Sequence, residues 1–342
     1  MNNVLIVSLN PGGTMGHGRI VTSLSNNLIK YKKKVTLVSE TNYAYFFNID
    51  KKVNQIILPK SKHVPTLGGM YKYIQKNKIL DICEKKNINC IIFSTFFDLE
   101  LVKEIKKKRI NTILLSYPIR DTFRKALIFN KTYNSFDKIV SLYDPSTNEE
   151  KLKNEIIVNP LKTVLTIPEN RQKIDILLTC GGGGRYSAKV FINKTVDALK
   201  LIFKEKENLR VTFIKGNSKT KNMLSKINLI RWSKKFEELI ASSKIVISEA
   251  GYFTMLDLIN NNKSAILIPG IRRIDNQELR ALTLENLGLG KVFFPFEKKQ
   301  KLTELIKGSL KNSDKNNSKF IAIKRKFNKY AELTSVIQRE LI

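Results

Sequence analysis

Twice in this chain, a short β-branched strand runs into a glycine-rich turn and then into a helix. The first turn has four glycines within residues 12–18 and follows the predicted strand Val4–Ser8. The second turn, Gly181–Gly184, follows the predicted strand Ile174–Thr179. Each glycine loses much backbone entropy on folding, so a close approach of backbone to a ligand is the expected reason for such runs. The repeat predicts two doubly wound α/β domains in tandem.

The rest of the chain continues this alternation of strands and helices, which favours parallel sheets. Further strands are predicted at Val35–Ser39, Cys90–Thr95, Thr112–Ser116, Lys138–Ser141, Ile156–Asn159, Leu209–Ile214, Ile245–Ser248, Ala265–Pro269 and Lys291–Phe294. Residues 159–171 contain two prolines and no helical period, which indicates a linker. We therefore predict domains at 1–163 and 164–317, followed by a C-terminal helix over 318–342 that packs on the domains.

Length and composition exclude several classes of protein. A chain of 342 residues exceeds the roughly 250–300 at which single cores stop growing, which supports two domains. No apolar run approaches the about 18 residues that span a bilayer, so we expect a cytoplasmic protein. Three cysteines and two histidines, without paired metal spacing, favour neither a disulfide framework nor a zinc site.

The chain is strongly basic, with 61 Lys and Arg against 30 Asp and Glu and a formal net charge of +31. Such a charge attracts anionic partners. An anionic membrane surface, a lipid-linked or other anionic acceptor, and nucleic acid all fit; nucleic acid is the least favoured, because no helix-turn-helix, zinc-finger or RNA-binding signature occurs. Coding bias, with the lysines on solvated helix faces, is the alternative explanation of the charge.

A candidate ligand site follows the strand Ile245–Ser248. Gly251 lets backbone approach a phosphate at the start of a helix, where N–H groups and the positive end of the dipole attract anions. Asp257 comes six residues later, about one and two-thirds turns at roughly 3.6 residues per turn. A carboxylate there can accept both hydroxyls of a ribose. An ordinary β-α-β crossover with a glycine at the bend is the alternative.

The first glycine turn carries His17, which we expect to face a ligand. The turn is not a P-loop, since no Gly-Lys-Ser/Thr follows it, and it is not a dinucleotide fingerprint. A helix-capping or packed imidazole is the alternative interpretation of His17.

At this point a family resemblance becomes specific. Residues 12–17, Gly-Gly-Thr-Met-Gly-His, resemble the GGTxGH loop of the MurG-type, family 28 glycosyltransferases, which add N-acetylglucosamine during peptidoglycan synthesis. The segment Ser248–Asp257, with the later Ile268-Pro269, Asp275–Gln277 and Leu287-Gly288, is similar to the donor-site signature of that family. The resemblance implies a GT-B fold, in which two Rossmann-like domains face each other across a cleft. It also implies a UDP-sugar donor as co-substrate, with no other cofactor.

The resemblance assigns the donor to the second domain. There, Gly251 and the amides after it would hold the diphosphate, Asp257 the ribose, Asn276 and Gln277 the sugar, and the loop beginning at Trp232 the base. The implied donor set is Gly181, Gly182, Gly183, Gly184, Arg185, Trp232, Ser233, Phe236, Gly251, Tyr252, Phe253, Thr254, Asp257, Asn276 and Gln277. The implied acceptor-side loop is Gly12, Gly13, Thr14 and Gly16, with His17 at the reacting centre.

Some positions depart from the family pattern. Glu249 stands where a basic or small residue is usual, Asp257 is one methylene shorter than the usual glutamate, and Gly183 replaces a common serine. The middle of the first domain resembles relatives of the family that are less well characterised than the peptidoglycan enzyme. The acceptor of that enzyme therefore cannot be assumed for this chain.

These features predict an inverting glycosyltransferase that moves a hexose or N-acetylhexosamine from a UDP-sugar to an acceptor hydroxyl. Helix N-termini and glycine-loop amides can stabilise the leaving diphosphate, and no Asp-x-Asp motif stands where a cation would be needed, so we expect metal independence. His17 is the first candidate for the general base, with Asp98 and Asp121 in reserve; either aspartate could equally be a helix cap.

Two other functional classes stay open. One is a nucleotide-sugar hydrolase of nonulosonate synthesis, which would have the same scaffold and a comparable histidine. The other, suggested by the charge, is a nucleic-acid-binding protein or a DNA-modifying glycosyltransferase. Apolar residues at 43–47 and 67–71 favour peripheral contact with the inner face of the cell membrane, although both stretches could instead pack in the core.

Overall fold

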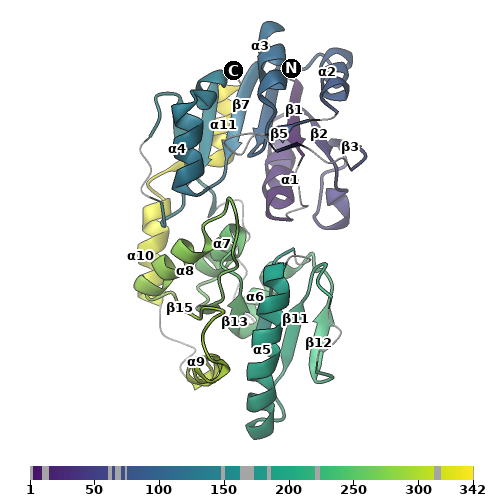
Figure 1. Cartoon of the computed structure of the whole chain (residues 1–342). Coiled ribbons are helices and arrows are strands. Elements are labelled where there is room, and N and C mark those ends of the chain that lie inside the picture. The colour runs from purple at the N-terminus through teal and green to yellow at the C-terminus, as the bar shows by residue number, and fades with distance from the viewer. Residues whose placement is uncertain are drawn as a thin grey trace. The chain divides into compact units, whose positions relative to one another are not determined.

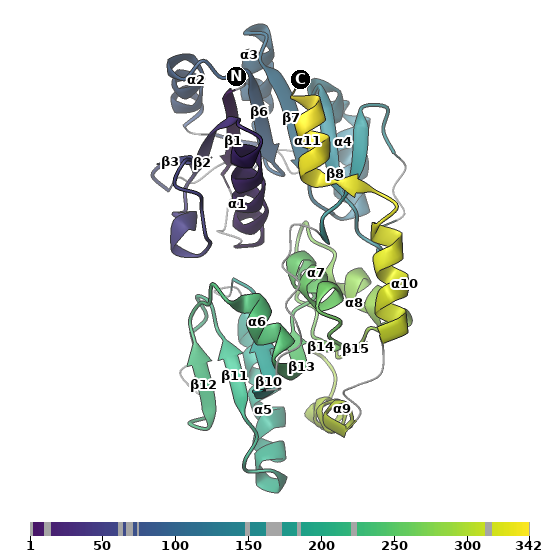
Figure 2. The same cartoon turned by 180° about the vertical axis from the view of Figure 1, so that it is seen from behind.

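A computed structural model describes residues 3–9, 15–60, 64–65, 71–73, 75–147, 151–161, 173–182, 186–219, 224–311 and 317–341. Its residue contacts divide the chain into two compact units. Unit 1 comprises Met1–Thr163 and Lys329–Ile342, and unit 2 comprises Val164–Asn328. Figure 1 and Figure 2 show the elements of each unit from opposite sides.

Unit 1 is built on a parallel sheet of eight strands among the described residues, in the order β16-β9-β8-β7-β6-β1-β2-β3. The strands are β1 (Asn3–Ser8), β2 (Lys34–Ser39), β3 (Asn54–Ile57), β6 (Cys90–Ser94), β7 (Asn111–Ser116), β8 (Lys138–Leu142), β9 (Glu155–Asn159) and β16 (Ala331–Glu332). A small antiparallel pair, β4 (Val64–Pro65) and β5 (Tyr71–Lys72), stands apart from this sheet.

Helices cover both faces of the unit 1 sheet. They are α1 (Met15–Lys30), α2 (Lys76–Lys85), α3 (Leu99–Lys107), α4 (Asp121–Phe129) and α11 (Leu333–Glu340), with the 3-10 turns η1 (Tyr43–Tyr45) and η3 (Thr132–Ser135). Helices α1 and α11 pack together on one face, whereas α3 and α4 lie on the other (Figures 1 and 2). The strands between them are almost wholly buried, as expected of a parallel sheet covered on both sides.

Unit 2 repeats the architecture with a six-stranded parallel sheet among the described residues, in the order β12-β11-β10-β13-β14-β15. The strands are β10 (Ile174–Thr179), β11 (Val211–Ile214), β12 (Ile227–Ile230), β13 (Ser243–Ser248), β14 (Ala265–Leu267) and β15 (Gly290–Val292). The helices are α5 (Tyr186–Glu205), α6 (Phe236–Ala241), α7 (Tyr252–Asn260), α8 (Gln277–Asn286), α9 (Lys299–Lys311) and α10 (Asn317–Phe327). The core between sheet, α5 and α9 contains Phe191, Leu199, Phe213 and Ile306.

The prediction of two doubly wound α/β domains is confirmed. The C-terminal segment differs from the prediction of one helix over 318–342. Helix α10 buries Phe320, Ile323 and Phe327 and packs on α7 of unit 2, whereas α11 buries Val336 and Ile337 and packs on α1 of unit 1. Between them, β16 pairs with β9. The helix is interrupted because its apolar residues serve two separate cores.

Candidate functional site

In each sheet the order of the strands reverses direction at one point, beside the first strand of the unit. In unit 2 the first strand, β10, is flanked by β11 and β13, so the order reverses between β10 and β13. In unit 1 the equivalent point lies between β1 and β6. Open α/β sheets bind ligands outside the carboxyl ends of the strands at such switch points. The candidate sites are therefore the segments that follow these four strands.

In unit 2, Gly251 is the N-cap of α7, with extended backbone angles (φ −65°, ψ 144°) and no side-chain cap. Of the described residues, a Cβ built on Gly251 would meet only Thr254, whose hydroxyl lies at 3.8 Å, so none of them crowds the space beside this glycine. The first N–H groups of any α-helix have no acceptor within the helix, and the dipole makes that end positive. The predicted diphosphate residues, Gly251–Thr254, thus lie where an anion is favoured.

Asp257 lies on the same helix but is fully buried, with 0% of its surface exposed. Its neighbours Leu256 and Leu258 are also buried, because α7 is covered on several sides. In this conformation the carboxylate presents no surface to a ligand. Contact with a ribose therefore stays a prediction that requires movement of the covering side chains.

The loop between β14 and α8 is tied to itself by the side chains that the sequence assigned to the donor sugar. Gln277 is buried, accepts the Gly270 N–H at 2.9 Å and donates to Asp275 at 3.1 Å. Asn276 is the N-cap of α8 and accepts the Leu279 N–H at 3.4 Å. Both amides therefore have structural partners in this loop or in the first turn of α8, and a role toward the sugar remains a prediction.

Two ion pairs that the sequence did not indicate lie beside the start of α7. Arg280, on α8, is 1% exposed and donates to Asp275 at 2.8 Å. Arg272 forms an ion pair with Glu249, and both side chains are largely buried. Glu249 departs from the family pattern, and its charge is balanced by this arginine from the neighbouring loop.

Gly270 permits close packing between the loop and α5. A Cβ on Gly270 would lie 2.8 Å from the Glu249 carboxylate and 3.0 Å from Cβ of Ser187, so a side chain there would displace one of them. The Ser187 hydroxyl is buried and has no hydrogen-bond partner within the described part of the chain. This hydroxyl stands in the second position of α5, directly after the glycine run.

The glycine run after β10 is only partly described, since Gly183, Gly184 and Arg185 lie outside the described residues. Gly181 has a positive φ of 60°. The carbonyl of Gly182 accepts the Asn217 N–H at 3.0 Å, and a Cβ on Gly216 would lie 2.5 Å from the same carbonyl oxygen. At least one close approach in this run is therefore between two turns of the protein's own backbone.

Cys180 precedes the run, and its burial disfavours the thiolate form. Burial raises the pKa of its thiol to about 11, despite a contact with the Ser218 hydroxyl at 3.4 Å. Burial likewise raises the pKa of Cys83 and of Cys90 to about 12. All three cysteines are buried free thiols.

The predicted base loop follows β12, next to the Gly216 turn, whose N–H donates to the Arg231 carbonyl at 3.0 Å. Trp232 is half-buried, and the Ser233 hydroxyl accepts the Lys235 N–H at 3.0 Å. Phe236 begins α6. The loop follows β12, the Gly216 turn follows the adjacent β11, and the Gly181 turn follows β10, so unit 2 groups the three at the carboxyl edge of its sheet.

In unit 1, His17 lies in the first turn of α1, beside Gly16, and is half-buried between two aromatic rings. Its ring centroid is 4.2 Å from that of Tyr117 and 5.4 Å from that of Phe96. Tyr117 follows β7 and Phe96 follows β6, so three segments meet at the carboxyl edge. Gly12, Gly13 and Thr14 lie outside the described residues.

The surroundings of His17 are aromatic and hydroxylic. Tyr117 is buried, and burial raises the pKa of its phenol well above the usual value, in spite of the Ser94 hydroxyl 3.4 Å away. Gly18 leaves room for the ring of Tyr43. A Cβ built on Gly18 would lie 2.4 Å from that ring. Tyr43 is buried and meets the Ser8 hydroxyl at 3.1 Å, whereas Tyr45, in the same predicted membrane-contact stretch, is 67% exposed.

Asp98 has the helix-cap role that was its alternative interpretation. It is buried, caps α3 through the Leu101 N–H at 3.1 Å, and accepts the Tyr73 N–H at 2.6 Å. Tyr73 in turn donates its hydroxyl to the Phe96 carbonyl. Both carboxylate oxygens thus bind backbone, and Asp98 acts on the site by holding the turn that carries Phe96.

That turn contains Thr95, which has a positive φ of 64°. A left-handed conformation in a β-branched residue is a strained outlier, of the kind that is retained where surrounding contacts impose it. Its N–H donates to the Leu115 carbonyl at 2.9 Å. Asp121, the other alternative candidate for the general base, is exposed in the first turn of α4. There its negative charge interacts favourably with the positive end of the helix dipole.

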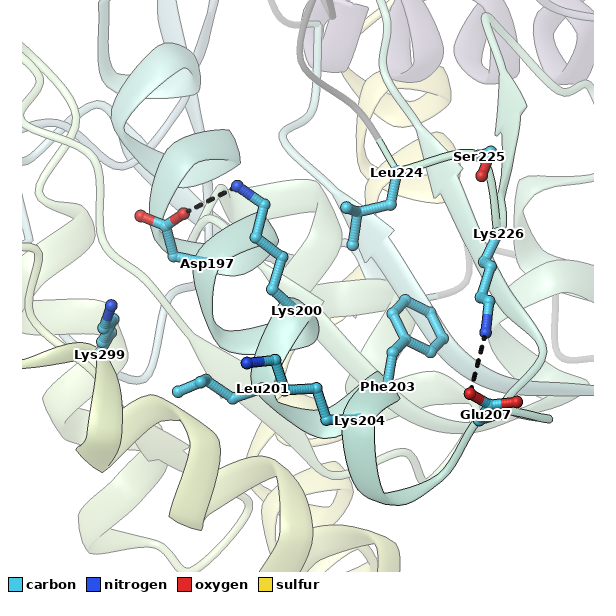
Figure 3. A pocket seen from close by; sticks show the side chains of 10 residues that line it. All are labelled: Asp197, Lys200, Leu201, Phe203, Lys204, Glu207, Leu224, Ser225, Lys226 and Lys299. Carbon is cyan, nitrogen blue, oxygen red and sulfur yellow. Dashed lines mark ion pairs between the residues drawn. The ribbon is translucent and has the colours of Figure 1, made fainter.

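A shallow hollow of about 580 Å³ lies elsewhere on unit 2 (Figure 3). We call it the α5 hollow; it is lined by Asp197, Lys200, Leu201, Phe203, Lys204, Glu207, Leu224, Ser225, Lys226 and Lys299. Lys226 directly precedes β12, and Glu207 lies before β11, so the hollow is at the amino ends of these strands. It is therefore on the opposite edge of the sheet from the glycine turns.

The described ranges contain no group of three or more His, Cys, Asp and Glu side chains arranged to hold a metal ion. None of the helices in those ranges combines the length and apolar character needed to cross a bilayer.

Comparison with known proteins finds a family match within the second half of the chain. Residues 176–334 match the glycosyltransferase family 28 C-terminal domain. No curated protein sequence matches the chain significantly.

Solved structures match over the whole length. They include the glycotransferase of kitacinnamycin (TM-score 0.68, 10% identity, 100% of this chain and 99% of that one) and MurG of Acinetobacter baumannii (0.62, 12%, 99% and 100%). The spinosyn rhamnosyltransferase SpnG, solved with thymidine diphosphate, matches at TM-score 0.65 with 11% identity over 99% of both chains. At these identities the similarity establishes the fold, which is GT-B.

The family match runs from within β10 to the first residues of α11 and includes the switch point of unit 2, the N-cap of α7 and helix α8, which carries Gln277 and Arg280. The fold match covers both units. Residues 176–334 are thus similar to the glycosyltransferase family 28 C-terminal domain, and the chain as a whole has the GT-B fold.

Proposed function

We propose that the protein transfers a hexose or N-acetylhexosamine from a UDP-sugar to an acceptor hydroxyl, with inversion at the anomeric carbon. The observation that carries the proposal is the N-cap of α7, where Gly251 leaves open space at the switch point of unit 2. This feature lies within the family 28 segment. Thymidine diphosphate is the ligand named for SpnG, so thymidine is the alternative base.

Unit 2 has the donor role in this proposal. The amides at the start of α7 bind the diphosphate, and the loop 232–236 binds the base. Negative charge grows on the diphosphate as the glycosidic bond breaks, and fixed dipoles stabilise such charge without reorganisation. We therefore propose that transfer requires no metal ion.

Unit 1 supplies the general base that deprotonates the acceptor. The acceptor oxygen forms a bond to the anomeric carbon while the bond from that carbon to the diphosphate oxygen breaks. The nucleoside diphosphate leaves with the bonding electron pair, and His17 takes the proton of the acceptor hydroxyl. Attack from the side opposite the leaving group inverts the configuration. A histidine suits this step because its unperturbed pKa lies near neutrality.

The basic charge of the chain favours an anionic acceptor. A net charge of +31 raises the local concentration of a phosphorylated or lipid-linked glycan. It also favours contact with an anionic membrane surface at low salt.

Ligand binding tests the donor assignment. The midpoint of thermal unfolding should rise with UDP-sugars, because a ligand at about 100 times its Kd stabilises the folded state by about 2.7 kcal/mol. The panel should include UDP-, dTDP- and GDP-sugars, each with and without EDTA. No shift with any nucleotide would contradict the proposal, and a shift abolished by EDTA would contradict metal independence.

Turnover separates transferase from hydrolase. Release of UDP and free sugar at full rate without acceptor would favour the nucleotide-sugar hydrolase. Transfer predicts that UDP release depends on an added acceptor. His17→Ala should slow transfer and leave UDP binding nearly unchanged, since unit 2 holds the donor.

A further inference from the structure

Arg280 is a fully buried cation in a position that the donor assignment does not require. It is 1% exposed and among the largest fully buried side chains of the described structure. Its Nη1 donates to the Ala250 carbonyl at 2.9 Å and to Oδ1 of Asp275 at 2.8 Å. Its guanidinium carbon is 5.4 Å from the ring centroid of Tyr252. The guanidinium therefore contacts residues on both sides of Gly251, the N-cap of α7.

A chain of hydrogen bonds continues from Arg280 into the loop before α8. Oδ1 of Asp275 accepts from Arg280, and Oδ2 accepts from Gln277 at 3.1 Å. The other end of the Gln277 amide accepts the Gly270 N–H at 2.9 Å. These hydrogen bonds, from Gly270 through Gln277, Asp275 and Arg280 to Ala250, connect the loop after β14 to the start of α7.

The two charges of the pair are screened unequally. The side chain of Asp275 is 32% exposed, whereas that of Arg280 is 1% exposed. Water weakens the field of an exposed charge far more than that of a buried one. The pair therefore leaves positive potential at the buried end, which is the end next to α7. This potential adds to that of the helix dipole.

We propose that Arg280 and Asp275 are positioning residues for the diphosphate of the donor. The assignment rests on the proposed function, in which the first turn of α7 binds that diphosphate. Arg280 does not touch the ligand. It holds the first turn of α7 against the loop 270–276 and keeps a fixed positive charge beneath the amides. Asp275 orients the guanidinium and keeps it from being a lone buried charge.

A purely structural pair would predict a different result from a positioning pair. Loss of a structural pair loosens the whole site, so a nucleoside and its diphosphate lose affinity together. Loss of a positioning pair weakens only the part of the affinity that comes from the diphosphate. The ratio of nucleoside to diphosphate affinity is therefore the decisive readout.

The experiment measures the affinities of UDP, dTDP, uridine and thymidine by titration calorimetry, with competition for the weak nucleosides. The variants are Arg280→Met, Arg280→Lys and the double variant Asp275→Asn with Arg280→Met, which leaves no unpaired buried charge. Arg210→Met is the matched control, because Arg210 pairs with Asp175 at an exposed site at the amino end of β10. Circular dichroism and unfolding midpoints establish that each variant is folded.

We expect Arg280→Met to weaken diphosphate binding about tenfold or more and nucleoside binding less than about twofold. Arg280→Lys should recover part of the loss, because it keeps the charge but not the guanidinium fork. The double variant should match Arg280→Met, and Arg210→Met should match wild type. If Arg280→Met does not fold, the lysine and double variants provide the same comparison.

Two results would overturn the assignment. One is an equal loss of nucleoside and diphosphate affinity, which would make the pair structural. The other is a folded Arg280→Met or double variant with wild-type UDP affinity. A wild-type protein that binds none of the four ligands would instead overturn the proposed function, and this assignment with it.

Discussion

The two candidate sites occupy equivalent positions in their sheets but have opposite chemistry. In unit 1, the ring of His17 lies against the rings of Phe96 and Tyr117. In unit 2, the start of α7 lies against the ion pairs of Arg280 and Arg272. A group that exchanges a proton benefits from packing that orients it without fixing its charge, whereas a site for a leaving diphosphate benefits from fixed charge. Topology sets where the sites are, and side chains set what each can do.

Buried ion pairs are not restricted to the donor side. In unit 1, Arg124 on α4 binds Glu155 on β9 through two bonds, of 3.1 and 2.7 Å, and both side chains are buried. Glu155 also accepts the Leu152 N–H and the Ser141 hydroxyl, so its oxygens are used within the fold. The pair in unit 2 differs because its arginine also binds the carbonyl before the N-cap of α7.

The largest effect should come from breaking the pair in unit 1. Arg124→Met leaves Glu155 buried without its cation, which typically costs about 3–5 kcal/mol of unfolding free energy. Arg210→Met, at an exposed pair, should change stability little. Urea unfolding at pH 7 measures both. Similar losses in the two variants would contradict the distinction between buried and exposed pairs.

The same pair predicts an acid dependence. Burial opposes ionisation of Glu155, but hydrogen bonds from Arg124, Leu152 and Ser141 and the charge of Arg124 outweigh it and lower its pKa. Because the folded pKa is below the unfolded one, the stabilisation is complete above about pH 4.3, the unfolded value, and is lost as the pH falls through the folded pKa. In Arg124→Met, the unfolding free energy should no longer fall in this way as the pH is lowered.

A second comparison tests why unit 2 needs its glycines. Gly216 and Gly181 have similar positive φ values, 58° and 60°, so alanine should cost each about 1–2 kcal/mol of left-handed strain. A Cβ on Gly216 would also lie 2.5 Å from the Gly182 carbonyl oxygen, whereas no described residue lies within 4 Å of a Cβ on Gly181. Gly216→Ala should therefore cost about 3 kcal/mol in total. Equal unfolding midpoints for the two alanine variants would show that the turns can move apart.

Packing of the Tyr117 ring on His17 should contribute to turnover. Tyr117→Leu should slow turnover about tenfold, or about 1.4 kcal/mol, because the ring of His17 loses one of its two flanking rings. Tyr117→Phe keeps the ring and should retain most of the activity. Burial raises the pKa of the Tyr117 phenol, so the phenol stays neutral near pH 7. Its ionisation should therefore not contribute to the pH dependence of turnover. A phenylalanine variant as slow as the leucine variant would assign the effect to the hydroxyl.

The central strands were predictable because they are buried on both faces and read as continuous apolar runs. Strand β6, for example, is buried throughout. The edge strands β3 and β12 were missed, since they are partly exposed and contain Asn54, Gln55 and Asn228. Local patterns carry less information where one face of a strand contacts water.

The candidate site was predictable in position more than in detail. Gly251 and the start of α7 follow from a strand, a glycine and a helical period, which are local signals. The partners of Asp98 and Gln277 depend on which backbone groups lie nearby, and that is set by the fold. Arg280 was missed because an arginine inside a polar helical stretch normally points to solvent; its burial depends on Asp275 and on a carbonyl thirty residues earlier.

The smallest effect should come from the lysines of the α5 hollow, and it sharpens the comparison of local with overall charge. Lys204 and Lys299 lie at the amino edge of unit 2, away from the glycine turns. Charges separated by more than the Debye length of about 8 Å are screened at physiological salt. Lys204→Gln with Lys299→Gln should therefore change UDP affinity less than about twofold and stability by less than about 0.5 kcal/mol.

Titration of this lysine variant with UDP at low and at physiological salt distinguishes two sources of attraction. A small loss that appears only at low salt would reflect the overall field of a protein with a net charge of +31. A loss at physiological salt as large as that of Arg280→Met would mean that total charge, rather than the fixed guanidinium beneath α7, holds the diphosphate. The aromatic surroundings of His17 and the ion pairs beside α7 would then differ in packing but not in function.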